Sequence, residues 1–282
     1  MLSLLVSVVT GCVVTTSIPT ERQYALARRV DGRPAVLPPD DPLYDRFDRE
    51  VLSDPTLQRL LMVFEHTTES FLATNGIIPA PRTVANRLVI ILNGETTGVR
   101  RDVRLATPDG QARVELALAL GQGGEADIAG ARHRMAAAMG PLLLELVGRR
   151  PPPGFSLEML AAPDEPAPPE EALWAGYALA LEAEYARPFL GREPLDESAY
   201  ALNPPPGALL ERQGAIVARA EAGMTAAESN TTSQEEDRGH SVRSPSAVAA
   251  FIVALHRRAG SYYPQHHMLW MVSYEAEEVR LP

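Results

Sequence analysis

The sequence predicts an α+β protein that is mainly α, with a helical body and one small antiparallel sheet at about residues 88–120. Apolar residues recur at helical spacing in several alanine- and leucine-rich segments after residue 54. Only the stretch from 88 to 120 joins a continuous apolar run to period-two alternation and turn residues. Hydrophobic residues form 45% of the 282-residue chain, which is enough for a substantial core.

The chain begins with an uncharged apolar segment that ends at its only cysteine, in the run Leu5-Val6-Ser7-Val8-Val9-Thr10-Gly11-Cys12. An apolar stretch closed by a small residue, glycine and cysteine resembles the lipobox of bacterial lipoproteins. The resemblance implies that residues 1–11 are a removed signal and that Cys12 becomes an acylated N-terminus. Because no Lys or Arg precedes the run, the α-amino group would supply the positive charge or the start would lie upstream. Two alternatives remain: this segment is an uncleaved membrane anchor, or it is a first strand in which Cys12 is buried.

The resemblance also implies a location and a partner. A protein acylated at Cys12 would be held in the cell envelope, on the extracytoplasmic side of a membrane, with the lipid bilayer as its partner. We expect residues 12–50 to form a tether, since Thr, Ser and Pro follow the cysteine and prolines recur further on. Residues 51–282 then form a single globular, mostly helical domain.

The first expected helix opens at Asp54-Pro55, where Ser53 or Asp54 supplies the N-cap, and closes at Asn75-Gly76. The continuous apolar run of residues 88–92 predicts a buried strand, with a short helix from about Thr83 as the alternative. A hairpin follows over residues 99–120, because alternating apolar residues flank the turn Pro108-Asp109-Gly110.

The second half of the chain predicts helices separated by loops. One helix is expected over about 125–147, with Pro141 kinking or dividing it. A proline-rich linker covers residues 149–169. Helices are then expected over residues 170–186, 208–228 and 245–260, the last turning Val248, Phe251, Ile252 and Leu255 inward. Residues 261–282 carry an aromatic cluster that we expect to close the core.

The charge balance bears on the kind of partner. The net charge is −10, and every basic side chain is an arginine because the chain contains no lysine. A nucleic-acid surface needs clustered basic residues, so this acidic balance argues against a nucleic-acid partner.

His133 is a weak candidate metal ligand. A hairpin that leads into a helix bearing His133-Arg134-Met135-Ala136-Ala137 resembles the layout of gluzincin-type zinc metallopeptidases, whose helix carries HExxH. Only His133 matches, since Arg134 stands at the position of the base and Ala137 at that of the second ligand. Ala175, within Trp174-Ala175-Gly176-Tyr177-Ala178, would stand where the third ligand is expected. The resemblance therefore implies an inactive relative, while an ordinary amphipathic helix explains the same residues.

The remaining sequence contains no G-x-S-x-G elbow, no Walker loop and no pair of metal-binding cysteines. We therefore expect no catalytic residues, no bound metal and no cofactor. The sequence favours a membrane-anchored extracytoplasmic lipoprotein with a non-catalytic binding or scaffolding role toward a protein or small-molecule ligand. The alternative is a hydrolase or an inactive relative of a zinc metallopeptidase.

Overall fold

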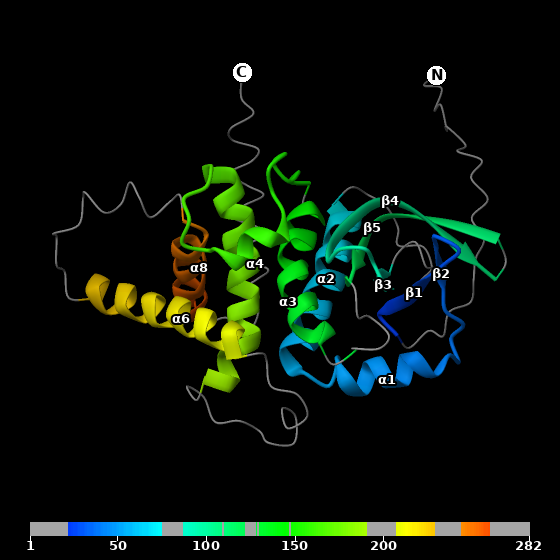
Figure 1. The fold of residues 1–282 in the computed structure, drawn as a ribbon, viewed down its shortest axis with the longest axis horizontal. Helices are drawn as coiled ribbons and strands as arrows, with labels where there is room; N and C mark the ends of the chain where they lie inside the picture. Colours follow the sequence, from blue (N-terminus) through cyan, green and yellow to red (C-terminus); the bar gives the residue numbers. More distant parts are fainter. Residues whose placement is uncertain are drawn as a thin grey trace.

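A barrel of strands lies at one end of the molecule, and helices α6 and α8 lie at the other (Figure 1). The computed structural model describes residues 22–74, 87–108, 110–121, 128, 130–146, 148–190, 207–228 and 244–259. Helices α2 and α3 stand between the barrel and α4, and α1 runs along another side of the barrel.

The five strands close on one another in the order β1-β2-β4-β5-β3. They are β1 (Tyr24–Val30), β2 (Arg33–Val36), β3 (Leu88–Leu92), β4 (Gly98–Thr107) and β5 (Gly110–Ala119). Hairpins β1–β2 and β4–β5 are antiparallel, whereas β3 runs parallel to both β1 and β5. The β1–β2 turn is Asp31-Gly32, with φ of 49° and 79°, as two-residue hairpins of this type require.

The expectation of a small antiparallel sheet over residues 88–120 is therefore wrong. The predicted strand at 88–92 and the hairpin that follows it are present, but they form part of a closed, mixed barrel. Two further strands come from residues 24–36, and one of them pairs in parallel with Leu88–Leu92. A parallel partner so far away in the chain leaves no turn signal in the sequence.

The expected tether over residues 12–50 is wrong for the part that the structure describes. From Tyr24 onward this stretch forms β1, β2 and helix α1 (Pro42–Glu50), and Tyr24, Leu26 and Phe47 are buried. The Tyr24 hydroxyl donates to Asp48 of α1 at 2.5 Å, and the Leu26 amide donates to the Tyr44 hydroxyl at 3.0 Å. These contacts hold α1 against the barrel.

The strands separate two hydrophobic cores. The barrel interior is small and is filled by alanine and valine together with Ile91 and Leu105. The other face of β1, β3 and β5 packs against the helices through larger residues, including Leu26, Ile90 and Leu118. Since β3 is covered on both faces, all five of its residues are buried, which explains its continuous apolar run.

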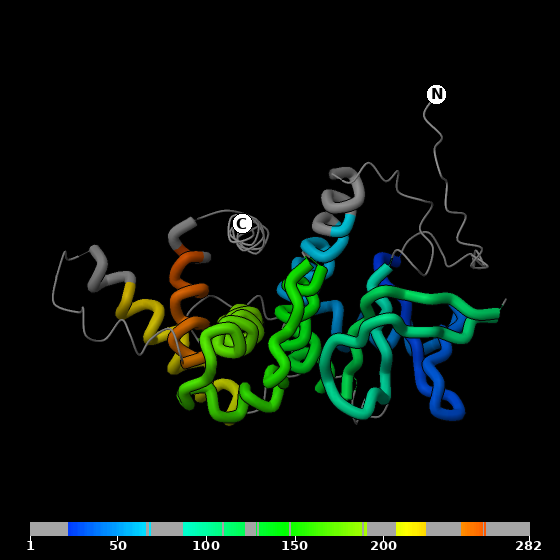
Figure 2. Tube along the Cα trace, turned by 90° about the horizontal axis from the view of Figure 1, so that it is seen from above, coloured from blue at the N-terminus to red at the C-terminus, as the bar shows by residue number. Residues whose placement is uncertain are grey.

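Figure 2 shows the helical part beside the barrel from a second direction. Beyond α1 its helices are α2 (Pro55–Thr74), α3 (Ala131–Leu146), α4 (Pro169–Ala186), α6 (Gly207–Glu228) and α8 (Pro245–Ala259), with short 3-10 segments η2 (Leu157–Ala161) and η3 (Arg187–Leu190). Asp54 caps α2 as expected, since its Oδ1 accepts from the amides of Thr56 and Leu57. Helix α4 lies among α3, α6 and α8 and is buried on nearly every side.

Close helix packing depends on two glycines. A Cβ on Gly140 of α3 would lie 2.8 Å from the Ala178 Cα of α4, and one on Gly176 would lie 2.6 Å from the Val248 side chain of α8. These positions have room for hydrogen only, so α3, α4 and α8 approach one another closely there.

Two helices differ from their expected form. Helix α3 begins at Ala131, later than the expected start near residue 125. Phe251 of α8 was expected to face inward, but it is 64% exposed, because α4 and α6 cover the opposite side of α8.

Several expectations fall outside the described residues. These are the C-cap at Asn75-Gly76, the aromatic tail 261–282 and the acylated Cys12. Within the described ranges, no helix is both long enough and apolar enough to cross a membrane.

Candidate functional site

The barrel, helix α3 and the proline-rich linker border a half-open pocket of about 740 Å³. Its walls come from the loop after β3 and the start of β4, from the last turns of α3, and from residues 151–158. The lining residues are Thr96, Thr97, Gly98, Val99, Arg100, Pro141, Glu145, Pro151, Pro152, Pro153, Phe155, Ser156, Leu157 and Glu158. A pocket of this size can hold a small organic molecule.

Helix α3 contributes to the pocket because of its local sequence. Pro141 and Glu145 are four residues apart, so they lie on the same helix face and both line the pocket. The neighbouring Gly140 instead faces α4, where only a glycine fits. Pro141 contributes an apolar ring to the wall of the pocket.

Glu145 is the buried charge of this site. Its side chain is only 5% exposed, and its Oε2 accepts from the Nε of Arg101 at 2.5 Å. Burial raises the pKa of the Glu145 carboxyl, and the adjacent Arg101 guanidinium opposes that rise. Glu145 lines the pocket, and its carboxylate is paired with Arg101 through one of its two oxygens.

Arg100 places a positive charge in the same pocket. Its NH2 donates to the Thr96 Oγ1 at 2.6 Å and to the Thr96 carbonyl at 3.2 Å, which holds the guanidinium beside the loop. The Thr97 hydroxyl accepts from the Gly121 amide at 2.9 Å and ties this loop to the end of β5. The pocket therefore combines a fixed cation with the carboxylates of Glu145 and Glu158.

The linker wall is held in place by aromatic packing and a close backbone approach. Phe155 packs on Trp174 of α4 with ring centroids 5.4 Å apart. A Cβ on Gly154 would collide with the Glu171 carboxylate, so the linker passes directly over the first turn of α4. Within the expected linker of residues 149–169, the part from 151 to 158 thus forms a wall of the pocket.

A second group of buried polar residues lies where α2, α3 and α4 meet. Arg132 is 1% exposed and donates through Nε to the Glu50 carbonyl at 2.5 Å and through NH2 to Ser53 at 3.0 Å. Asp54 and Tyr185 are buried close enough to interact with it electrostatically. The buried Arg132 guanidinium donates to the carbonyl of Glu50, the last residue of α1, which has no partner within its own helix. We therefore assign this group a structural role.

The structure places His133 apart from the pocket. It is half-buried in the first turn of α3, and the twelve residues to Glu145 correspond to about 18 Å along the helix. Ala137 and Ala175, at the expected positions of lost ligands, are both buried. Among the residues that the structure describes, no group of three His, Cys, Asp or Glu side chains could hold a metal ion.

No sequence pattern predicted that Arg100 or Phe155 would line a pocket. For Glu145, only the composition of the surrounding residues gave an indication. Glu145 is the only charged residue between Met135 and Leu146, an otherwise apolar stretch. A lone carboxylate on such a stretch needs a charged partner if the helix is buried.

Comparisons with protein-family models, with curated proteins and with solved structures find no match to this chain.

Proposed function

We propose that the protein is a membrane-anchored extracytoplasmic lipoprotein that binds a small amine-containing ligand in the pocket between the barrel and the helices. The observation that carries the proposal is the pocket of about 740 Å³ with Arg100, Glu145 and Glu158 in its walls. Proteins bind small ligands in pockets of this size that combine an apolar surface with a few fixed polar groups.

The charges of the pocket favour a zwitterion, such as an amino acid or a short peptide. The carboxylates of Glu145 and Glu158 suit an ammonium group, and the Arg100 guanidinium suits a carboxylate. Phe155 and the three prolines offer an apolar surface for a side chain of the ligand. The proposed role is binding, and no observation among the described residues favours the alternative of a hydrolase.

The anchoring part of the proposal rests on the lipobox-like run that ends at Cys12. Labelling cells with a radioactive fatty acid tests it directly. We expect label to enter the wild-type chain and to be absent from the Cys12→Ala variant, which should leave the membrane fraction. Equal membrane association of both proteins would contradict the anchor.

Calorimetric titration of the purified protein with amino acids and dipeptides tests the ligand. Losing one hydrogen bond to a charged group is worth about 1.5–3 kcal/mol, so Glu145→Gln should weaken binding by about 10- to 100-fold. Glu145→Asp, which keeps the charge, should lose less. Glu165→Gln removes an exposed carboxylate outside the pocket and should bind as the wild type does. Absence of binding to every zwitterion, or equal losses in Glu145→Gln and Glu165→Gln, would overturn this assignment.

A further inference from the structure

Three arginines lie in one row across adjacent strands of the barrel. Arg104 of β4 and Arg113 of β5 are direct cross-strand partners. Ala35 of β2 pairs in parallel with Ala106 of β4, and Arg33 and Arg104 each lie two residues earlier. Arg33 therefore lies beside Arg104, and neighbouring strands are separated by about 4.8 Å.

All three side chains of this arginine row point away from the barrel interior. Val36, Leu105 and Val114 belong to the inner core, and each lies an odd number of residues from the arginine on its own strand. Side chains alternate between the two faces of a strand, so the arginines occupy the outer face. All three residues are exposed.

The row has positive, apolar and acidic neighbours. Val30 of β1 pairs with Arg33 and is 45% exposed, and Arg28 lies two residues earlier on the same face. Asp102 forms an ion pair with Arg113 at 2.5 Å. Arg28, Arg33 and Arg104 make no ion pair with any carboxylate in the part of the chain that the structure describes.

The positive charge is a property of the barrel, not of the whole chain. Residues 22–37, 87–108 and 110–121 contain nine arginines and four acidic residues, although the chain as a whole has a net charge of −10. Like charges directly opposite one another on neighbouring strands destabilise a sheet. The row is thus unfavourable for the barrel alone and becomes favourable beside a negatively charged partner.

We propose that the arginine row binds the phosphate groups of an anionic phospholipid surface and lays the barrel against the membrane. This inference rests on the proposed anchor at Cys12. Arg22 lies ten positions after Cys12, and a fully extended chain of that length spans at most about 36 Å. The anchor would keep the barrel within reach of the headgroups, and exposed Val30 at the end of the row can enter their apolar boundary.

Vesicle sedimentation of the full-length Cys12→Ala protein tests the row without any contribution from acyl chains. We expect the protein to sediment with phosphatidylglycerol vesicles at low ionic strength and not with phosphatidylcholine vesicles. An arginine near an anionic surface contributes about 1 kcal/mol, or about five-fold in partitioning. Replacing Arg33, Arg104 and Arg113 together with Gln should therefore lower partitioning about 100-fold.

A matched triple variant controls for net charge. Arg49→Gln, Arg59→Gln and Arg150→Gln remove three exposed arginines from the helical part, and this protein should partition as the parent does. Equal losses in both triple variants, or no binding of the parent to phosphatidylglycerol, would overturn the proposal. Tighter binding to a short DNA duplex, lost in the row variant, would assign the row to nucleic acid and also overturn it. Fatty-acid labelling of the wild type reports on the anchor separately.

Discussion

The barrel and the helical part differ in both charge and core composition. The described strands and their loops carry nine arginines and four acids, whereas residues 38–74, 130–146, 148–190, 207–228 and 244–259 carry twelve arginines and nineteen acids. The barrel interior is filled mainly by alanine and valine, whereas the shared core is filled by leucine, alanine and aromatic residues. The described residues of the barrel therefore carry a net positive charge and those of the helical part a net negative charge, and the pocket lies where the two parts meet.

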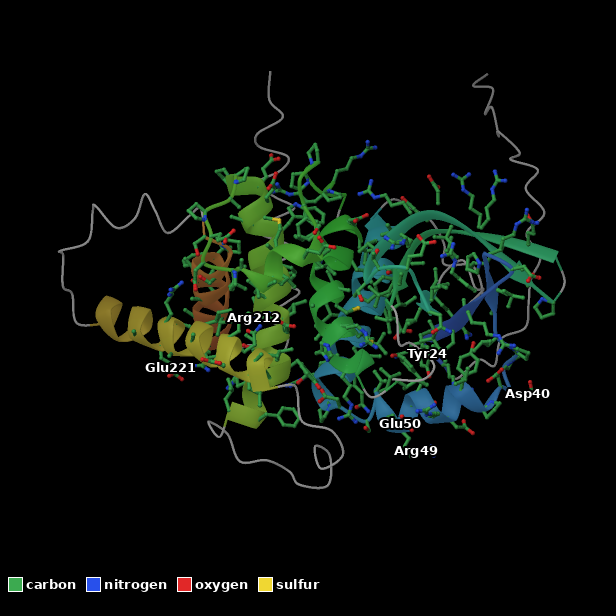
Figure 3. All side chains as sticks on the ribbon, in the orientation of Figure 1. Tyr24, Asp40, Arg49, Glu50, Arg212 and Glu221 are labelled. Carbon is green, nitrogen blue, oxygen red and sulfur yellow. The ribbon has the colours of Figure 1, made fainter. Side chains whose placement is uncertain are left out.

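The largest effect is expected from the contact that joins α1 to the barrel. Phe47 is fully buried and packs on Tyr24 with ring centroids 5.5 Å apart (Tyr24 is labelled in Figure 3). Phe47→Ala should lower the free energy of unfolding by about 3–5 kcal/mol, measured by urea denaturation. The partly exposed Val30→Ala should change it by less than about 0.5 kcal/mol. A small effect of Phe47→Ala would mean that α1 is not part of the folded body.

The close approach of α3 to α4 can be tested at one glycine. Gly140→Ala would place a methyl group against the backbone of α4, and overpacking of this kind costs about 1–3 kcal/mol in unfolding free energy. A Cβ on Gly223 of α6 would have nothing within 4 Å, so Gly223→Ala should instead stabilise the protein by about 0.5–1 kcal/mol. Thermal denaturation of both variants would reveal the opposite signs. Two shifts of the same sign would argue against the close crossing of α3 and α4.

The buried carboxyl of Glu182 should make the stability of the protein depend on pH. It is 3% exposed and accepts from Arg212 at 2.7 Å and from Gln213 at 2.5 Å, where α6 crosses α4 (Arg212 is labelled in Figure 3). Burial raises the pKa of the Glu182 carboxyl, and Arg212 and Gln213 oppose the rise. The folded state then holds this proton more tightly than the unfolded state does. Stability should therefore fall as the pH rises from the unfolded pKa of about 4.3 through the folded value.

The Glu182→Gln variant isolates this contribution. The unfolding free energy of the wild type, relative to that of the variant, should decline as the pH rises above the unfolded pKa of about 4.3. Urea denaturation at several pH values measures the difference. Curves that stay parallel above that pH would show that the carboxyl titrates alike in both states.

The smallest effect is expected on the surface of the barrel. Arg104 lies between Arg33 and Arg113, so Arg104→Gln removes the repulsion from both neighbours and should stabilise the protein by a few tenths of a kcal/mol. High salt should abolish the gain, because it screens exposed charges. Differential scanning calorimetry at low and high salt is the measurement. A loss of stability at low salt would mean that the arginine row stabilises the barrel.

The sequence predicted the elements that are determined by local residues. Asp54-Pro55 marks the start of α2, and the strand at 88–92 and the hairpin after it lie where expected. These features depend on a cap, a turn or a short apolar run, each of which acts within a few residues.

What the sequence did not predict depends on partners distant in the chain. Tyr24 pairs with Leu88, and the prolines around residues 34–42 suggested an extended segment instead of a strand and a helix. Phe251 follows the helical spacing of its neighbours, but only the placement of α4 and α6 decides which side of α8 is covered. The pocket joins the loop after β3, the end of α3 and the linker, so only Glu145 gave a local sign of it.

The parallel pairing of β1 with β3 has a consequence for protein synthesis. The β1–β2 hairpin is complete once Val36 has been made, yet β3 begins only at Leu88. At about 5–20 residues per second, the nascent hairpin exists for roughly 3–10 s before its partner strand is made. During that interval the edge of β1 that pairs with β3 has no partner, and unpaired strand edges are sites of aggregation. The barrel contains the first described residues to be synthesised, but we expect it to close late. Faster synthesis of residues 37–120 should therefore improve the yield of folded protein.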